Sequence, residues 1–174
     1  MRIIALAFGL LLMSGCSTVY LNKDITGQVF PEVVGQSLEK KSVAIPNDFS
    51  GEITLLLIGY VQNSQFDIDR WLIGLDMTQT KVNVYEIPTI KGLFPKMFST
   101  FIDNGMRSGI PKPLWKGVIT VYEDGDKVQA LTGNEKPSNA RVVLLDKTGK
   151  ISYFYDQGFA VDALNQVRDA IEAQ

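Results

Sequence analysis

Residues 53–60 read Ile53-Thr54-Leu55-Leu56-Leu57-Ile58-Gly59-Tyr60, an almost unbroken run of apolar side chains. Turn-forming residues precede this run at positions 47–51, and a polar stretch follows it. A short, continuous apolar run between two turns is typical of a strand that is buried on both faces. We therefore place the centre of a covered β-sheet at residues 53–60.

The rest of the chain alternates between helical and extended patterns. The predicted elements are a short extended stretch within 38–45, a helix over 64–77, strands over 81–87 and 118–122 with a helix over 95–105 between them, one or two helical turns over 126–131, strands over 141–146 and 150–155, and a final helix after Gly158. Ser64 is a candidate N-cap, and Gly105 suits the end of the helix that begins near Pro95.

This order predicts an α/β domain with a central mixed sheet and helices on both faces. An early buried strand followed by a helix favours parallel pairing, whereas the late hairpin around residues 147–149 is antiparallel. The residues expected in the core are Leu55, Leu57, Trp71, Val143 and Leu145.

The first fifteen residues predict a cleaved signal peptide. Arg2 is followed by an apolar run over residues 3–13, which as a helix would extend about 17 Å, against about 30 Å for the hydrocarbon core of a bilayer. Such a run is too short to span a membrane but suits the apolar core of a signal peptide. It ends in Met13-Ser14-Gly15-Cys16.

This junction resembles the lipobox of bacterial lipoproteins, although Met13 stands where these proteins usually have Leu. The resemblance implies that Cys16 is lipidated and becomes the first residue, and that Ser17 after it favours the outer membrane, with the domain facing the periplasm. The expected organisation is a signal peptide over 1–15, a lipidated polar tether over 16–28 and a domain over 29–174. An ordinary secretory signal with an incidental cysteine, or a buried N-terminal helix, is the alternative.

Composition excludes several functions. The formal charge of −2 and the pI of about 5.2 show no excess of basic residues of the kind that indicates nucleic-acid binding. The chain has no histidine, which is the commonest general base and transition-metal ligand, and its single cysteine is Cys16. We therefore predict no metal, no cofactor and no disulfide within the chain.

Short motifs across residues 30–173 resemble the peroxiredoxin and thioredoxin-like group. They are Phe30-Pro31, Gly51, Trp71, Leu144-Leu145-Asp146, Gly149-Lys150-Ile151 and Gly158. Within that group the chain is similar to the thioredoxin-like factor that assists assembly of mitochondrial ATP synthase. The resemblance implies a thioredoxin-like fold.

The chain departs from this group where the group does its chemistry. Redox-active relatives carry two cysteines in the turn after the buried strand, where the helix N-terminus lowers the pKa of the first thiol. Residues 61–66 here read Val61-Gln62-Asn63-Ser64-Gln65-Phe66, and Ser138-Asn139-Ala140 replaces the proline that precedes the third long strand. We expect neither thiol oxidoreductase nor peroxidase activity.

By this resemblance, polar side chains gather at one edge of the sheet. They are Gln62, Asn63, Ser64, Gln65, Glu86 and Asn139. Trp115, in a proline-flanked loop near Arg107, is a further candidate contact residue because aromatic and arginine side chains dominate binding hot spots. The alternatives are that Glu86 pairs with a lysine or arginine and that Trp115 serves packing.

The leading hypothesis is a membrane-anchored, redox-inactive module that binds a protein partner in the cell envelope, as an assembly factor or chaperone does. The alternatives are a periplasmic carrier of a small ligand, and an enzyme that uses Glu86 or Ser64. The enzyme is disfavoured because the sequence offers no histidine base. A pocket at the candidate edge would favour the carrier, and a flat apolar patch would favour the partner-binding module.

Overall fold

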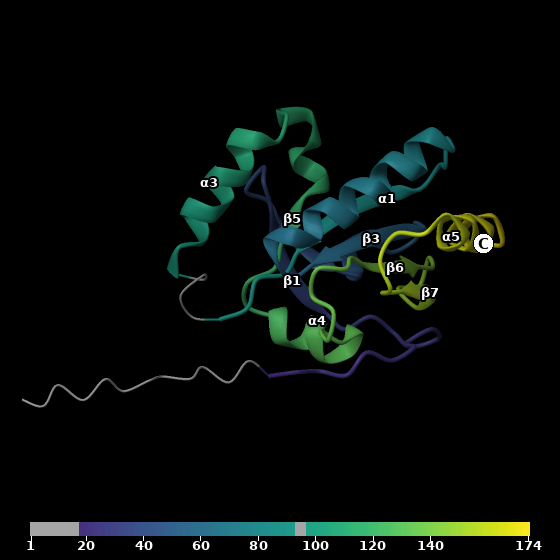
Figure 1. Cartoon of the computed structure of the whole chain (residues 1–174). Helices are drawn as coiled ribbons and strands as arrows, with labels where there is room; N and C mark the ends of the chain where they lie inside the picture. Colours follow the sequence, from purple (N-terminus) through teal and green to yellow (C-terminus); the bar gives the residue numbers. More distant parts are fainter. Residues whose placement is uncertain (1–17, 93–96) are drawn as a thin grey trace, which may run out of the picture.

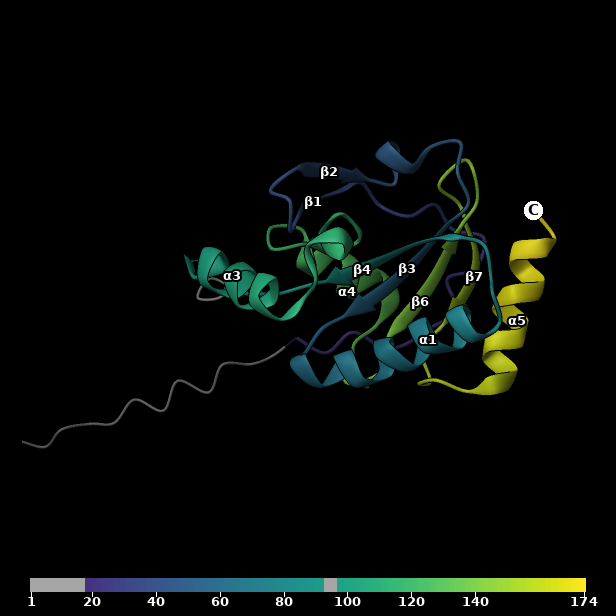
Figure 2. The same cartoon turned by 90° about the horizontal axis from the view of Figure 1, so that it is seen from above.

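The apolar run of residues 53–60 forms strand β3 (Thr54–Gly59), and all six of its residues are buried. The computed structural model describes residues 18–92 and 97–174. β3 pairs in parallel with β4 (Asn83–Pro88) and antiparallel with β6 (Arg141–Leu145), and β6 pairs antiparallel with β7 (Ile151–Tyr155). The resulting order is β4-β3-β6-β7, which Figure 2 shows in full, while Figure 1 shows β3, β6 and β7.

Helices α1 (Gln65–Met77) and α5 (Val161–Glu172) cover one face of this sheet (Figure 2). Leu55 and Leu57 of β3 point to this face and are fully buried. The Trp71 indole packs edge-on against Phe159, with ring centroids 5.3 Å apart. Leu55, Leu57 and Trp71 are therefore confirmed as core residues on this face.

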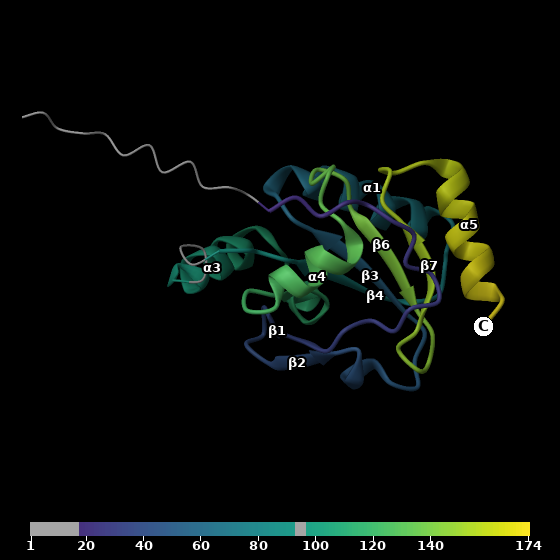
Figure 3. The same ribbon diagram turned by 90° about the horizontal axis from the view of Figure 1, so that it is seen from below.

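The opposite face is covered by the N-terminal segment, by the hairpin of β1 (Val33–Ser37) and β2 (Ser42–Ile45), and by α4 (Gly125–Thr132), as Figure 3 shows from below. Strand β5 (Ile119–Thr120) completes a second sheet in the order β2-β1-β5. Val143 and Leu145 belong to the core beneath these elements. The predicted fold class, a mixed sheet with helices on both faces, is confirmed.

The remaining elements are α3 (Ser99–Gly109) and three short 3-10 helices, η1 (Asn47–Phe49), η2 (Gln62–Ser64) and η3 (Lys112–Gly117). The helix predicted over 95–105 extends beyond Gly105 to Gly109, while its expected start at residues 95 and 96 lies outside the described residues. A glycine inside an exposed helix costs only about 1 kcal/mol. The helix ends instead before Pro111, which restricts Ile110 to extended backbone.

Residues 18–28 differ from the predicted tether, because they pack along the domain. Ile25 is fully buried in the core. The Tyr20 amide donates to Asn134 Oδ1 at 2.8 Å, and the Gly27 amide donates to the Ile151 carbonyl at 2.8 Å. The mostly polar composition hid this docking, which depends on one buried isoleucine and on backbone hydrogen bonds. Within the described residues, no helix is long and apolar enough to cross a membrane.

Candidate functional site

The turn that follows β3 is shaped by the close approach of Gly59 and Ser64. A Cβ atom on Gly59 would collide with Ser64 Oγ, so only glycine fits there. The Ser64 hydroxyl donates to the Val61 carbonyl at 2.6 Å and makes no capping bond to α1. Ser64 occupies the N-cap position of α1 as predicted, but its side chain does not cap the helix, because η2 continues directly into α1 and the hydroxyl turns back toward Val61.

Gln65 joins two carboxylates at the start of α1. Its Nε2 donates to Glu86 Oε2 at 3.0 Å and to Asp69 Oδ1 at 2.9 Å. Burial raises the pKa of Glu86 above its ordinary value, the hydrogen bond from Gln65 opposes that rise, and the charge of Asp69 adds to it. Among the described residues, Glu86 forms no ion pair with a lysine or arginine, so the alternative of a cationic partner is not observed and an amide takes its place.

A groove of about 440 Å³ opens beside this turn, and we call it the edge groove. Its lining residues are Gly59, Tyr60, Val61, Gln62, Ser64, Gln65, Ile68, Pro88, Ile90, Ile102 and Met106. The polar groups come from the turn and the first residue of α1, whereas Ile68, Ile102 and Met106 make apolar walls from α1 and α3. The volume lies within the range of small-ligand sites, about 300–1,000 Å³.

The structure brings together only part of the predicted edge. Gln62, Ser64 and Gln65 line the edge groove, and Glu86 is joined to it through Gln65. Asn63 is exposed outside the lining.

Asn139 and Trp115 lie elsewhere. The Asn139 amide donates to the Asp156 carbonyl at 3.0 Å, which directs this side chain toward the segment after β7. The Trp115 indole N–H donates to the Ile110 carbonyl at 2.8 Å, and its ring lies under the Arg107 guanidinium, 5.9 Å from its centroid. Both side chains make these contacts within the chain and lie outside the lining of the edge groove.

A buried arginine that the apolar pattern of the strand did not indicate fixes the loop before β6. Arg141 is fully buried, and its guanidinium donates to the carbonyls of Gly133, Lys136 and Asn139. Burial lowers the pKa of Arg141 from its ordinary value. A charged residue at the start of the apolar strand over 141–145 was the signal that could have revealed this role.

Tyr60 joins the edge groove to Arg141. Its ring lies under the Arg141 guanidinium, 4.9 Å from the centroid, and its hydroxyl hydrogen-bonds Thr132. Burial raises the pKa of Tyr60 to about 12, so the phenol is neutral at physiological pH. The back of the groove is thus held by hydrogen bonds and a cation–π contact. In residues 18–92 and 97–174, no three His, Cys, Asp or Glu side chains gather as metal ligands would.

Comparison with known proteins finds likeness in structure alone. No protein-family model and no curated protein matches the chain. A member of the Sco family of cytochrome c oxidase assembly proteins, BsSco, superposes with a TM-score of 0.59 at 13% identity, over 87% of this chain and 98% of that one. A thiol peroxidase from Chromobacterium violaceum gives 0.56 at 14% identity, over 88% and 91%.

The pneumococcal exposed lipoprotein thioredoxin of Streptococcus pneumoniae gives a TM-score of 0.54 at 12% identity, over 80% of this chain and 98% of that one. Identities this low show the fold and leave activity open. Together with the mixed sheet order β4-β3-β6-β7, these likenesses show that the chain has a thioredoxin-like fold.

Proposed function

We propose that this chain is a lipid-anchored envelope protein whose redox-inactive domain binds a partner protein at the edge groove, as an assembly or chaperone module. The observation that carries the proposal is the groove itself. It occupies the place where redox-active relatives hold their cysteines, and it combines apolar walls from α1 and α3 with a polar rim at Gln62 and Gln65. Such a groove suits an apolar side chain or short segment of another protein.

The groups around the groove support binding over catalysis. The Ser64 hydroxyl is 3% exposed and donates its proton to Val61, so it lacks both access and a base. Glu86 accepts a hydrogen bond from Gln65, which is neutral and cannot relay a proton as an acid. Disulfide chemistry would need a nucleophilic sulfur, and residues 61–66 have none.

The anchor is supported by the leader that ends in Ser14-Gly15-Cys16. The lipoprotein thioredoxin of Streptococcus pneumoniae indicates that this fold can be carried by a lipoprotein. Cys16→Ala should abolish labelling by a fatty-acid probe and release processed protein from the membrane, whereas Ser17→Ala should keep both. Unchanged labelling of Cys16→Ala would refute the anchor.

A second candidate is a carrier of a small apolar ligand, favoured by the groove volume of about 440 Å³. Photocrosslinking from the groove rim distinguishes the two. A photoreactive residue at Gln62 of the full chain, in its native membrane, should give a discrete protein adduct, while the same residue at exposed Asp76 should not.

The adduct should disappear when Met106→Trp fills the groove. A small-molecule adduct would support the carrier instead. A protein adduct that is equally strong from both positions, or no adduct from Gln62, would refute binding at the groove.

A further inference from the structure

Helix α3 is attached to the domain with its polar side inward. Asp103 is its one buried residue and is 4% exposed, whereas Phe101 is 80% exposed and Phe98, at the helix start, is 58% exposed. Met97 just before them is 68% exposed. A surface helix ordinarily packs its apolar stripe against the core. We call Met97, Phe98 and Phe101 the α3 apolar face.

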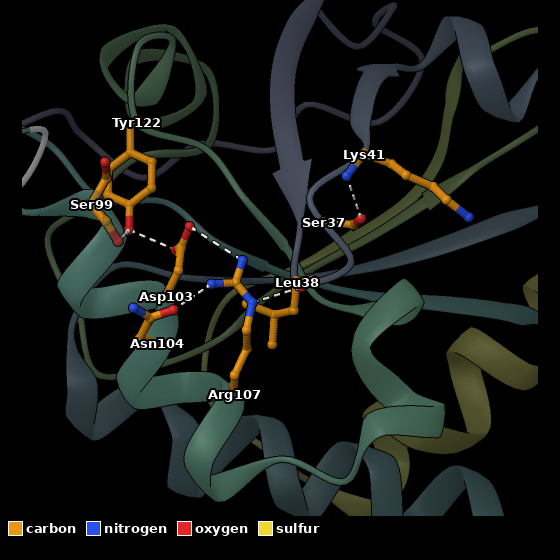
Figure 4. Close-up of polar contacts among 8 residues, drawn as sticks. All are labelled: Ser37, Leu38, Lys41, Ser99, Asp103, Asn104, Arg107 and Tyr122. Atoms are coloured by element: carbon orange, nitrogen blue, oxygen red, sulfur yellow. Dashed lines mark hydrogen bonds and ion pairs between the residues drawn. The ribbon is translucent and has the colours of Figure 1, made fainter.

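Polar contacts hold α3 in this orientation (Figure 4). The Tyr122 hydroxyl donates to Asp103 Oδ1 at 2.9 Å, and Arg107 Nη2 lies 3.9 Å from Asp103 Oδ2. Arg107 Nε also donates to the Leu38 carbonyl at 2.7 Å, which ties α3 to the end of the β1 strand. Because these partners are partly or fully buried, rotating α3 to hide its aromatic rings would break them.

The outer surface of α3 carries no charge that would oppose contact with an apolar medium. Its exposed side chains besides Phe101 are Thr100, Asn104 and Ser108. Ile102 and Met106 turn to the edge groove instead. A neutral surface with aromatic rings suits the interface between lipid headgroups and acyl chains, where a charge would be costly to desolvate.

The start of the described chain is held on the α3 side of the domain. The Thr18 carbonyl accepts a hydrogen bond from Asn134 Nδ2 at 3.0 Å. The Tyr20 ring lies under the Lys91 ammonium, 5.2 Å from the ring centroid, and Lys91 precedes α3 by eight residues. Figures 1–3 show the first described residues and α3 toward the same end of the domain, with α4 between them in Figure 1.

Covalent geometry then limits how far the domain can stand from its anchor. Consecutive Cα atoms are about 3.8 Å apart, so Cys16 lies within roughly 7–8 Å of Thr18 in any conformation. Residues 18–28 pack along the domain, so they do not act as a free linker that would hold the domain away from the membrane.

We infer that the α3 apolar face rests on the lipid bilayer that holds the acylated Cys16. This inference depends on the proposed anchor. It assigns the membrane surface as the partner that covers the α3 apolar face. The domain then lies against the bilayer with a fixed orientation, and its edge groove opens close to the lipid surface.

Single-cysteine labelling of the full lipoprotein tests this placement. Cys16 is the chain's one cysteine and its thiol carries the lipid, so Phe101→Cys introduces a unique site for an environment-sensitive fluorophore. Met77→Cys and Val161→Cys are matched controls, since these side chains are 79% and 64% exposed and lie on α1 and α5. Each protein is reconstituted in phosphatidylethanolamine and phosphatidylglycerol vesicles that contain a nitroxide-labelled lipid.

The fluorophore at position 101 should be quenched several-fold more than the fluorophores at 77 and 161. Equal quenching at the three positions would overturn the inference. Shielding at 101 that needs an added envelope extract, or that grows with protein concentration without lipid quenching, would assign the face to a partner or a second copy and also overturn it.

The mass of the N-terminal peptide separates this result from failure of the anchor. An unmodified Cys16 would overturn the anchor and the placement together. An acylated Cys16 with an unquenched label at 101 would overturn the placement alone.

Discussion

The carboxylate of Asp67, on the first turn of α1, accepts a hydrogen bond from the backbone amide of Ala140 at 2.8 Å. Its other oxygen accepts from the Phe159 amide at 2.7 Å. Asp67 is only 7% exposed, so one side chain joins α1, the loop before β6 and the segment before α5. Arg141 also holds this loop, by hydrogen bonds to the carbonyls of Lys136 and Asn139. Hydrogen bonds thus fix α1, which forms one wall of the edge groove, relative to the loop before β6 and the segment before α5.

Asp67→Ala should destabilise the domain, because it leaves two amides without their acceptor, each at a cost of about 1–3 kcal/mol when buried. Urea unfolding of the purified protein measures the change. Asp76→Ala removes an exposed carboxylate of the same helix and should change the free energy of unfolding by less than about 0.5 kcal/mol. Equal effects of the two substitutions would contradict the role of Asp67.

Leu57→Ala should cost about 2–5 kcal/mol, since Leu57 is fully buried at the centre of the sheet. Domains of this kind are stable by only about 5–15 kcal/mol, so the variant should unfold at a much lower urea concentration. Ile73→Ala, at a position that is 58% exposed on α1, is the control. A loss below about 0.5 kcal/mol for Leu57→Ala would be incompatible with this core.

Glu86→Gln should stabilise the protein at neutral pH. Burial raises the pKa of Glu86, so the folded state holds this proton more firmly than the unfolded state does. The resulting stability is complete below the ordinary glutamate pKa and is lost as pH rises through the raised value. The advantage of Glu86→Gln over the unsubstituted chain should therefore be present at pH 7 and shrink toward pH 3.

Urea midpoints measured across this pH range, with Glu172→Gln at an exposed position as control, check this expectation. An advantage that grows as the pH falls would show that the sign is wrong.

The lipoprotein should neither reduce insulin disulfides nor consume peroxide with dithiothreitol supplied. Disulfide exchange proceeds through thiolate attack, and the one thiol of this chain is Cys16, which we expect to carry lipid. The three methionines that follow Cys16 can be oxidised but do not exchange disulfides. Turnover above that of a heat-denatured sample, in the full chain and in Cys16→Ala alike, would refute this prediction.

Local sequence determined the central elements of the fold. All six residues of β3 are buried, and a strand that is buried on both faces needs a continuous apolar run. The helix around Trp71 is buried on one face, and such a helix needs apolar residues at helical spacing. Both patterns can be recognised in the sequence alone. The missing cysteines of residues 61–66 likewise decided the chemistry to expect. Gln65 and Glu86 met as predicted, since Gln65 lies just beyond β3 and Glu86 lies near the end of β4, its parallel neighbour.

Tertiary structure alone decided the rest, because the partners lie far apart in the sequence. Asn134 binds Tyr20 across 114 positions, and this contact turns a presumed tether into a docked segment. The apolar pattern of α3 would equally suit a buried helix, and only the contacts of Asp103 with Tyr122 and Arg107 turn its aromatic rings outward. Periodicity specifies which residues share a face of a helix, whereas the direction of that face depends on the partners that the rest of the chain brings to it.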